Sequence, residues 1–336
     1  MKARVTRRDF ITLLGGAVAP TVLRPRAACA QQERRVRRVG LLLAFPDADP
    51  EGTERLELFR RGLAGLGWVE GRNLRIDVRW AGAEAERWRS LARELVALTP
   101  DVIVTHNFTT TQELRDATTT IPIVFVGLND PVASGLVSNL ARPEANVTGF
   151  MQYEYSLAGK WLSLLKDMAP QLVRVALLFP GMQAAAPLYV RAAQNAGARL
   201  ALRITTAGVR GAAGIEPAIA AMAGSDDGGL LVLPGVFNTL NRATTIELAA
   251  KYRVPAIYPG RSFVSDGGLM SYGADARLQY RDGATYVDRI LRGAKPAELP
   301  VQFATKFELV INLKTARALG LGVSQQLLFV ADEVIE

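Results

Sequence analysis

Cysteine and histidine are almost absent from this 336-residue chain, which has one of each, Cys29 and His106. Cys29 falls in the leader described below, so the remaining chain would have no cysteine for a disulfide, a thiol nucleophile or a metal site. A single histidine makes a histidine metal site or a Ser-His triad equally hard to assemble. We therefore expect no cofactor and no metal. Hydrolysis could use only carboxylates, and no suitably spaced pair stands out.

The first thirty residues have the pattern of an export signal. Arg7 and Arg8 precede an apolar stretch that is too short for a membrane span of about 20 residues. The arginine pair resembles a twin-arginine signal, and Ala28 and Ala30 are the small residues expected before a cleavage site. We expect residues 1–30 to be a twin-arginine-like signal peptide, and the mature protein to be periplasmic and not membrane-spanning.

Two other interpretations of this leader remain open. It could be an amphipathic helix of a cytosolic protein, or Cys29 could be the lipidated residue of a lipoprotein. Arg26 counts against the second, because a lipoprotein signal has a leucine-like residue at that place.

Little net charge remains once the leader is removed. Residues 1–30 hold six basic residues and one acidic residue, so the formal net charge falls from +8 to about +3. This balance does not indicate nucleic-acid binding. The arginines at 34, 35, 37 and 38 precede the first expected strand, and we expect them to form a solvated, flexible start.

Short apolar runs rich in Val, Ile and Leu alternate with longer stretches of helical period. This alternation is typical of parallel strands that crossover helices cover on both faces. One set of expected strands covers residues 39–44, 74–78, 102–105 and 123–126, and a second set covers residues 173–179, 200–204, 230–233 and 256–258. Helical patterns fall between them, as at residues 54–66, 187–196 and 239–252. The two sets predict two similar α/β lobes.

A connector at residues 141–149 separates the two sets and contains Pro143, which is typical of a change of domain. Residues 267–273 and 299–303 resemble two further crossings, with a helix expected at 277–292 between them and a closing segment at 307–319. We therefore assign residues 31–148 and 273–300 to the first lobe, and residues 149–272 and 301–336 to the second. Three crossings predict a hinge.

In open parallel sheets, ligands collect beyond the carboxyl ends of the strands. The first lobe offers Phe45, the run 107–111, and Asn129-Asp130 at these ends. The run 107–111 starts a helix, whose free N–H groups favour an anionic group by about 0.3–1 kcal/mol. It is a candidate carboxylate cradle, although Thr and Asn are also ordinary helix caps and Asn129-Asp130 resembles a turn. His106 is more typical of a packed or surface residue than of a ligand contact.

The second lobe offers Gly181, Phe237, Tyr258 and Arg261 at its strand ends. Phe237 and Tyr258 could stack on a flat ligand and Arg261 could pair with a carboxylate, but such residues are also common at core edges and surfaces. The glycine-rich stretch 62–67 ends an amphipathic helix and lacks a following Gly-Lys-Ser/Thr, so it does not predict a nucleotide site.

Several long motifs resemble one family in the right order, from about residue 38 to the end of the chain. They are "GLGWVEGRNLRIDVRWA", "ELVALTPDVIVT", "TTTIPIVFVGLNDPVASGLVSNLARPEANVTGF" and "TKFELVINLKTARALGL". They are similar to the ABC transporter substrate-binding proteins that include TrpX-like periplasmic solute-binding proteins. The resemblance implies a periplasmic-binding-protein type I fold, with two Rossmann-like lobes, three hinge crossings and a ligand clamped between the lobes.

Some members of that family bind aromatic amino acids. On this analogy Thr109 and Thr110 would take the carboxylate, with Asp130 or Asp275 near the amine. The chain departs from the family at residues 143–146, where relatives commonly have Pro-Gly-Gly-Asn, and at Pro180-Gly181, where they have Asn-Pro. The identity of the ligand therefore does not transfer.

The resulting hypothesis is a monomeric extracytoplasmic receptor of an ABC importer, which does no chemistry, closes on a carboxylate-bearing ligand such as an amino acid, and meets a permease. A receptor that feeds a signalling partner, a secreted hydrolase and a LacI-type regulator are the alternatives; the last would need a DNA-binding segment where the leader stands. The candidate ligand-binding residues are Phe45, Asn107, Thr109, Thr110, Asn129, Asp130, Tyr153, Gly181, Phe237, Tyr258, Arg261, Tyr272 and Asp275.

Overall fold

The computed structural model describes residues 35–82, 85–143, 145–181, 183, 186–224 and 226–336. The expected signal peptide, with its arginine pair and its cleavage site, lies outside the described residues. Within the described ranges, no helix is both long enough and apolar enough to cross a membrane.

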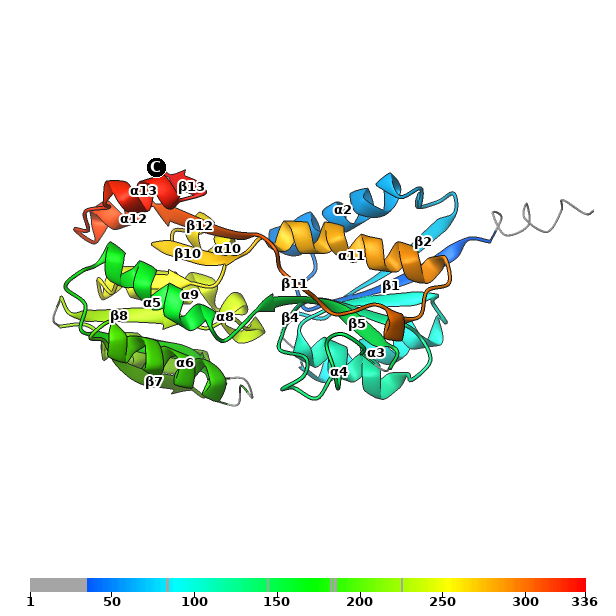
Figure 1. The fold of residues 1–336 in the computed structure, drawn as a ribbon, viewed down its shortest axis with the longest axis horizontal. Coiled ribbons are helices and arrows are strands. Elements are labelled where there is room, and N and C mark those ends of the chain that lie inside the picture. Colours follow the sequence, from blue (N-terminus) through cyan, green and yellow to red (C-terminus); the bar gives the residue numbers. More distant parts are fainter. Residues whose placement is uncertain (1–34, 83–84, 144, 182, 184–185, 225) are drawn as a thin grey trace, which may run out of the picture. The chain divides into compact units, whose positions relative to one another are not determined.

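The first sheet has six parallel strands in the order β11-β5-β4-β3-β1-β2. Helices cover both of its faces (Figure 1): α2 and α11 pack on one side and α3 and α4 on the other. The strands are β1 (Arg37–Leu43), β2 (Leu74–Trp80), β3 (Val102–His106), β4 (Ile123–Asn129), β5 (Val147–Tyr153) and β11 (Gln302–Phe303). The helices are α2 (Pro50–Gly65), α3 (Ala85–Ala97), α4 (Phe108–Ala117) and α11 (Ala276–Leu291). We call these elements the first lobe.

The second sheet has seven strands in the order β13-β12-β10-β9-β8-β6-β7, and β12 runs antiparallel to β10. The strands are β6 (Arg174–Pro180), β7 (Arg203–Val209), β8 (Gly228–Val232), β9 (Ala256–Tyr258), β10 (Met270–Ala274), β12 (Phe307–Asn312) and β13 (Glu333–Ile335). The helices are α5 (Leu157–Met168), α6 (Ala186–Arg199), α7 (Ile215–Ala220), α8 (Val236–Leu240), α9 (Arg242–Lys251), α10 (Arg261–Ser265), α12 (Leu313–Ala318) and α13 (Gln325–Val330). Short 3₁₀ turns lie at Ala212–Gly214 and Pro296–Glu298. We call this second sheet and the helices α5 to α10, α12 and α13 the second lobe.

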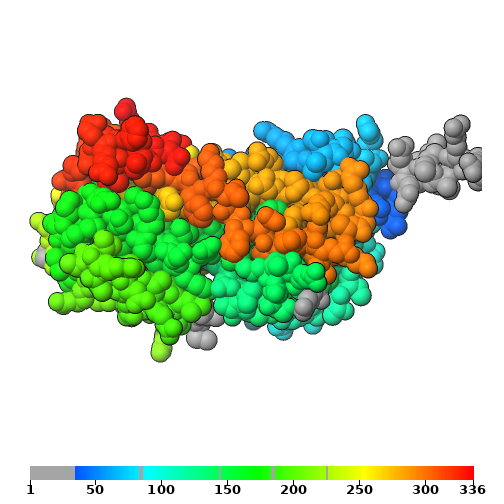
Figure 2. Space-filling view, viewed as in Figure 1, coloured from blue at the N-terminus to red at the C-terminus, as the bar shows by residue number. Residues whose placement is uncertain are grey.

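The chain passes between the two sheets three times: after β5, between β10 and α11, and between β11 and β12. The lobe boundaries expected after residues 148 and 272 fall inside β5 and β10. The pairing of β5 with β4 runs through Tyr153, so the chain leaves the first sheet after that residue. The third crossing lies at the molecular surface, in orange in Figure 2, where Phe303 is 44% exposed.

Two expectations about the ends of strands were wrong. Arg37 and Arg38 are not a solvated start: they open β1, and their guanidinium groups pair with Asp101 and Asp77 at 2.7 Å. The strand expected at 200–204 is β7, which begins later because the backbone N–H of Leu200 still closes the last turn of α6. β7 is an edge strand with exposed residues, so no apolar run marks it.

Candidate ligand-binding site

The turn from β3 into α4 is shaped by Asn107. Its backbone has a φ of 80° and a ψ of 170°, a positive-φ conformation that is rare in residues other than glycine. Its side-chain oxygen accepts a hydrogen bond from the backbone N–H of Thr110 at 3.1 Å and so caps α4. The amide nitrogen of the same side chain is buried and has no hydrogen-bond partner among the described residues. Asn107 therefore presents a free donor beside the positive end of a helix.

The two threonines predicted to cradle a carboxylate have different places in this turn. Thr110 is fully buried, and its hydroxyl donates to the carbonyl oxygen of His106 at 2.6 Å. The hydroxyl of Thr105 lies 2.7 Å from the same oxygen of Thr110. Thr110 thus holds the turn together, whereas Thr109 is partly exposed in the first turn of α4.

His106 lies at the centre of a buried cluster behind this turn. Its ring stacks on Phe45 with 4.9 Å between ring centroids, and its Nε2 atom lies 3.1 Å from Nη1 of Arg55. Burial, and then the positive charge of Arg55, hold the pKa of His106 well below its ordinary value. His106 is therefore neutral at physiological pH.

Helix α2 supplies the charged part of the cluster. Asp49 caps it by accepting from the backbone N–H of Gly52 at 3.0 Å, which places Glu51 and Arg55 one turn apart as an ion pair. Arg55 is only 8% exposed. Burial lowers the pKa of its guanidinium, but the negative charge of Glu51 raises it, and the pKa of Arg55 is raised overall, so Arg55 stays charged.

Tyr280 of α11 closes the cluster from the other side. The Arg55 guanidinium lies 5.5 Å from its ring centre and 4.9 Å from that of Phe45. Burial raises the pKa of Tyr280 to about 12, so its hydroxyl is neutral. One carboxylate oxygen of Glu51 and Nδ1 of His106 are buried without hydrogen-bond partners in the part of the chain that the structure describes.

Asn129 and Asp130 lie at the carboxyl end of β4, the neighbour of β3. The Asp130 carboxylate accepts backbone N–H groups of Val132 at 3.1 Å and Ala133 at 2.9 Å, so it holds a turn. Burial and the charge of Asp130 both raise the pKa of the Tyr155 hydroxyl. Asp130 therefore faces an aromatic residue that begins the second lobe.

Tyr155 belongs to an aromatic cluster of the second lobe. It meets Tyr189 edge to face at 4.9 Å, and Tyr189 stacks on Trp161 at 5.9 Å. The Tyr189 hydroxyl is buried and lacks a hydrogen-bond partner within the described ranges. Two side-chain oxygens near the carboxyl ends of β6 and β8 share this property: Oε1 of Gln183 and Oδ1 of Asn238.

Gly181 and Phe237 lie at the same strand ends as Gln183 and Asn238. Gly181 is exposed after β6 and donates its backbone N–H to Val209 at 2.8 Å. Phe237 lies in the first turn of α8 after β8 and packs partly against the core. They border the unpartnered oxygens without supplying a polar side-chain atom themselves.

Three predicted tyrosines are engaged in the structure itself. Tyr153 donates its hydroxyl to the carbonyl oxygen of Pro259 at 2.5 Å and ties the end of β5 to the second lobe. Tyr258 is 1% exposed and stacks on Phe263 at 5.0 Å. Tyr272 stacks on Phe307 at 5.7 Å.

Arg261 and Asp275 are also engaged, within one network of charges. Arg261 pairs with Glu308 at 3.2 Å and with Glu333. Asp275 caps α11 and pairs with Arg277 at 2.9 Å, and Arg277 in turn reaches Glu308 at 3.1 Å. Each of these charges has its partner inside the protein.

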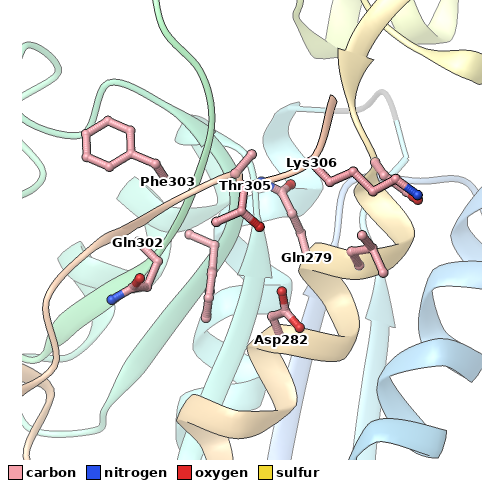
Figure 3. Close-up of a pocket in the computed structure, with 10 residues that line it drawn as sticks. Gln279, Asp282, Gln302, Phe303, Thr305 and Lys306 are labelled. Atoms are coloured by element: carbon pink, nitrogen blue, oxygen red, sulfur yellow. The ribbon is translucent and has the colours of Figure 1, made fainter. Parts of the chain in front are cut away.

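Two small cavities, of about 70 and 140 Å³, flank the third crossing. In the first, Gln279 and Asp282 on α11 and Thr305 on the crossing segment face a common hollow (Figure 3). Ligand pockets usually measure about 300–1,000 Å³. We therefore place the candidate site at the strand ends instead.

Five residues near these strand ends were not predicted from the sequence: Glu51, Arg55, Tyr155, Tyr189 and Gln183. One signal was available for the first two: an acid and a base four residues apart, in a helix that starts directly after a strand-end loop. The contact of Arg55 with His106 joins residues 51 positions apart, and no local pattern indicates it.

The family model described as ABC transporter substrate binding protein matches residues 51–335. A relative named tyrosine-binding protein, from Clostridioides difficile (strain R20291), is 26% identical over 266 residues, which are 78% of this chain and 75% of that protein.

Solved structures agree on the fold. A conserved domain protein from Vibrio cholerae is 27% identical with a TM-score of 0.82, over 89% of this chain and 100% of that one. An ABC domain from Streptococcus pneumoniae, in complex with L-Trp, is 23% identical with a TM-score of 0.82, over 89% and 99% of the two chains. The predicted periplasmic-binding-protein type I fold is confirmed. The chain belongs to the ABC transporter substrate-binding protein family, whose members bind solutes and are not enzymes.

Proposed function

We propose that this protein is an extracytoplasmic receptor that binds an amino acid and presents it to the permease of an ABC importer. Family membership supports the receptor role. One relative is named for tyrosine, and one structure with the same fold holds L-Trp. Both favour an amino acid with an aromatic side chain as the solute.

The observation that carries the proposal is the free amide nitrogen of Asn107. Its oxygen is fixed by the helix cap, so the nitrogen must point its two N–H groups elsewhere. A buried donor without a partner is costly, and a carboxylate supplies a charged acceptor. The adjacent first turn of α4, where Thr109 lies, adds the favourable field of a helix N-terminus. We place the carboxylate of the solute there.

The other end of the site supports an amine and an aromatic ring. Asp130 carries a negative charge beside Tyr155, which packs edge to face on Tyr189, and the buried hydroxyl of Tyr189 has no partner among the described residues. An ammonium group would be attracted both to Asp130 and to these rings. Asp275, the other candidate for the amine, is already paired with Arg277.

We propose that the two lobes close on the bound solute about the three crossings. Small-angle scattering tests this: the bound solute should lower the radius of gyration of the protein. Identical profiles with and without solute would indicate a rigid scaffold.

The identity of the solute can be tested with protein purified without refolding. Native mass spectrometry should show a retained molecule with the mass of an aromatic amino acid, and calorimetric titration should then rank the twenty amino acids. L-Tyrosine and L-tryptophan should bind more tightly than alanine or lysine. Failure of every amino acid to bind would overturn the assignment of the solute class.

Export through the twin-arginine route is part of the same proposal. Changing both arginines, Arg7→Lys with Arg8→Lys, should hold the precursor in the cytoplasm, because that route reads the arginine pair. Fractionation of cells checks this. An unchanged periplasmic yield would contradict it, and a mature N-terminus at a lipid-modified Cys29 would instead indicate a lipoprotein.

A further inference from the structure

The one histidine of the chain is enclosed on three sides. Phe45 stacks on one face of the His106 ring at an angle of 13°, and Tyr280 lies at a ring distance of 6.3 Å. The ring edge that carries Nε2 faces Arg55 at 3.1 Å. Gly127 lies beside the same edge of the ring, because a β-carbon at its position would be 3.6 Å from Cδ2 of His106. Nδ1 therefore lies on the opposite edge of the ring.

Arg55 decides which ring nitrogen carries the proton. A guanidinium has only donors and keeps its proton in proteins, so Nη1 donates and Nε2 must accept. The neutral imidazole then has its hydrogen on Nδ1. The ionisable groups around the ring are Arg55 and Glu51 from α2, Tyr280 from α11 and Tyr153 from β5. Burial and the charge of Arg55 keep the ring neutral.

The resulting Nδ1–H group has no acceptor. Nδ1 is buried and without a hydrogen-bond partner among the residues that the structure describes, and so is the amide nitrogen of the next residue, Asn107. Two consecutive residues at the end of β3 thus hold unpaired donors. A residue that served only to pack would gain nothing from a fixed proton position.

We propose that Arg55 locks His106 as the Nδ1–H tautomer, so that the ring is a permanent hydrogen-bond donor to an oxygen of the bound solute. Arg55 is then a positioning residue, and Glu51 holds it in place. The contact with the solute rests on the proposed function, whereas the locked tautomer does not. A fixed Nδ1–H donor on His106 favours solutes that place an acceptor oxygen there over solutes that place a donor there.

Selective ¹⁵N-histidine labelling tests the lock directly, because the chain contributes one histidine signal once any histidine tag has been removed. Long-range ¹H–¹⁵N spectra of the ligand-free protein should show a protonated Nδ1 and an unprotonated Nε2, unchanged between pH 8 and pH 5.5. A proton on Nε2, or a titration with a pKa near about 6.5, would overturn the proposal.

Removing the lock should release the ring. Glu51→Gln with Arg55→Met takes away both charges together and leaves neither one buried alone. In this variant we expect a mixture of tautomers and an ordinary histidine titration. Arg60→Met, which removes a partly exposed arginine from the same helix, should leave the spectrum of His106 unchanged. An unchanged Nδ1–H signal in the double variant would show that Arg55 does not set the tautomer.

L-Tyrosine then probes the contact with the solute. Its addition should shift the Nδ1 signal of the wild-type protein more than the Nε2 signal. His106→Phe keeps the stacking but removes the donor, and should lower the affinity about tenfold or more. His106→Asn places an amide nitrogen near the former Nδ1 and should restore part of that loss. A silent Nδ1 signal on saturation, or equal affinity of wild type and His106→Phe, would overturn the contact.

The two proposals can fail separately. If no amino acid binds, the proposed function is wrong, and the tautomer measured in the ligand-free protein still decides whether Arg55 locks the ring.

Discussion

The turn after β3 and the charged network of the second lobe both lie at carboxyl ends of parallel strands, yet they treat their polar groups in opposite ways. In the second lobe, Arg261 and Asp275 are paired with charges of their own lobe or of α11. In the turn after β3, Asn107 and His106 each keep one side-chain nitrogen without a partner among the described residues. Both regions lie at strand ends, and the unpartnered nitrogens are the reason why we propose the turn after β3 as the binding site.

This difference separates two reasons for keeping a polar residue. A paired charge in the network of Arg261 stabilises the fold, so its loss should change stability and leave binding alone. An unpaired donor costs free energy in the empty protein, so under the proposed function its loss should change binding more than stability.

The largest effect is expected for Asn107→Asp. Aspartate keeps the oxygen that caps α4 and tolerates the φ of 80°, so the fold should be retained. It removes the donor and adds a negative charge opposite the carboxylate of the solute. A hydrogen bond to a charged group contributes about 1.5–3 kcal/mol, so its loss alone should lower the affinity for L-tyrosine about ten- to a hundredfold in calorimetric titration, and the added charge should lower it further.

Asn139→Asp is the matched control for this change. Asn139 is exposed and also accepts backbone N–H groups, those of Ala141 and Arg142, so the same substitution is made away from the site. It should leave affinity unchanged. An Asn107→Asp protein that is destabilised and still binds at wild-type strength would reduce Asn107 to a helix cap.

The next effect is a dependence of stability on pH. The pKa of His106 is lowered in the folded protein, so below about 6.5 the unfolded chain takes up a proton that the folded chain does not. The free energy of unfolding should therefore fall as the pH decreases from 6.5, by up to about 1.4 kcal/mol per unit, until the folded pKa is reached. Denaturant titrations of wild type and His106→Asn isolate this term, because all other groups are common to both. Parallel curves would show that His106 titrates normally.

A smaller effect is expected for Tyr189→Phe. The hydroxyl is fully buried without a partner in the described part of the chain, so removing it should leave the unfolding temperature unchanged or raise it. If the hydroxyl bonds the solute, affinity should fall about two- to tenfold, in line with about 0.5–1.5 kcal/mol for a neutral hydrogen bond. Melting curves and titration of one sample give both values. A destabilised variant with full affinity would make Tyr189 a residue of the fold alone.

The smallest effect on binding is expected for Arg261→Gln. Its ion pairs are partly exposed, so we expect a loss of stability of no more than about 1 kcal/mol and an unchanged affinity for L-tyrosine. Thermal melts and titration check the two parts. A loss of affinity comparable to that of Asn107→Asp would indicate that Arg261 of the second lobe binds the carboxylate of the solute.

The sequence predicted the buried parts of the fold better than its edges. The strand expected at 256–258 is β9, because an apolar run buried on both faces leaves an unmistakable pattern. β7 was misplaced by three residues at its start, because an edge strand lies partly in solvent and its composition is mixed. Local periodicity reports burial, and burial is weakest where a sheet ends.

For the candidate site, the sequence indicates a region but not the arrangement of its residues. The turn at Asn107 was selected, because a strand end followed by a helix start can be recognised locally. Thr110, from the same run, uses its hydroxyl inside the turn. The contact of Arg55 with His106 arises only when α2 packs beside β3, so neither the tautomer nor the unpaired donor could be predicted from the sequence.

The central claim is that Asn107 binds the carboxylate of the solute, and a thermodynamic cycle tests it most directly. Calorimetry would compare L-tyrosine with tyramine, which lacks the carboxylate, on wild type and on Asn107→Asp. The wild type should favour L-tyrosine strongly, and the variant should lose or reverse that preference, because Asn107→Asp removes the donor and adds a charge that repels the carboxylate, which tyramine lacks. An equal preference for L-tyrosine in both proteins would contradict the claim and place the carboxylate elsewhere.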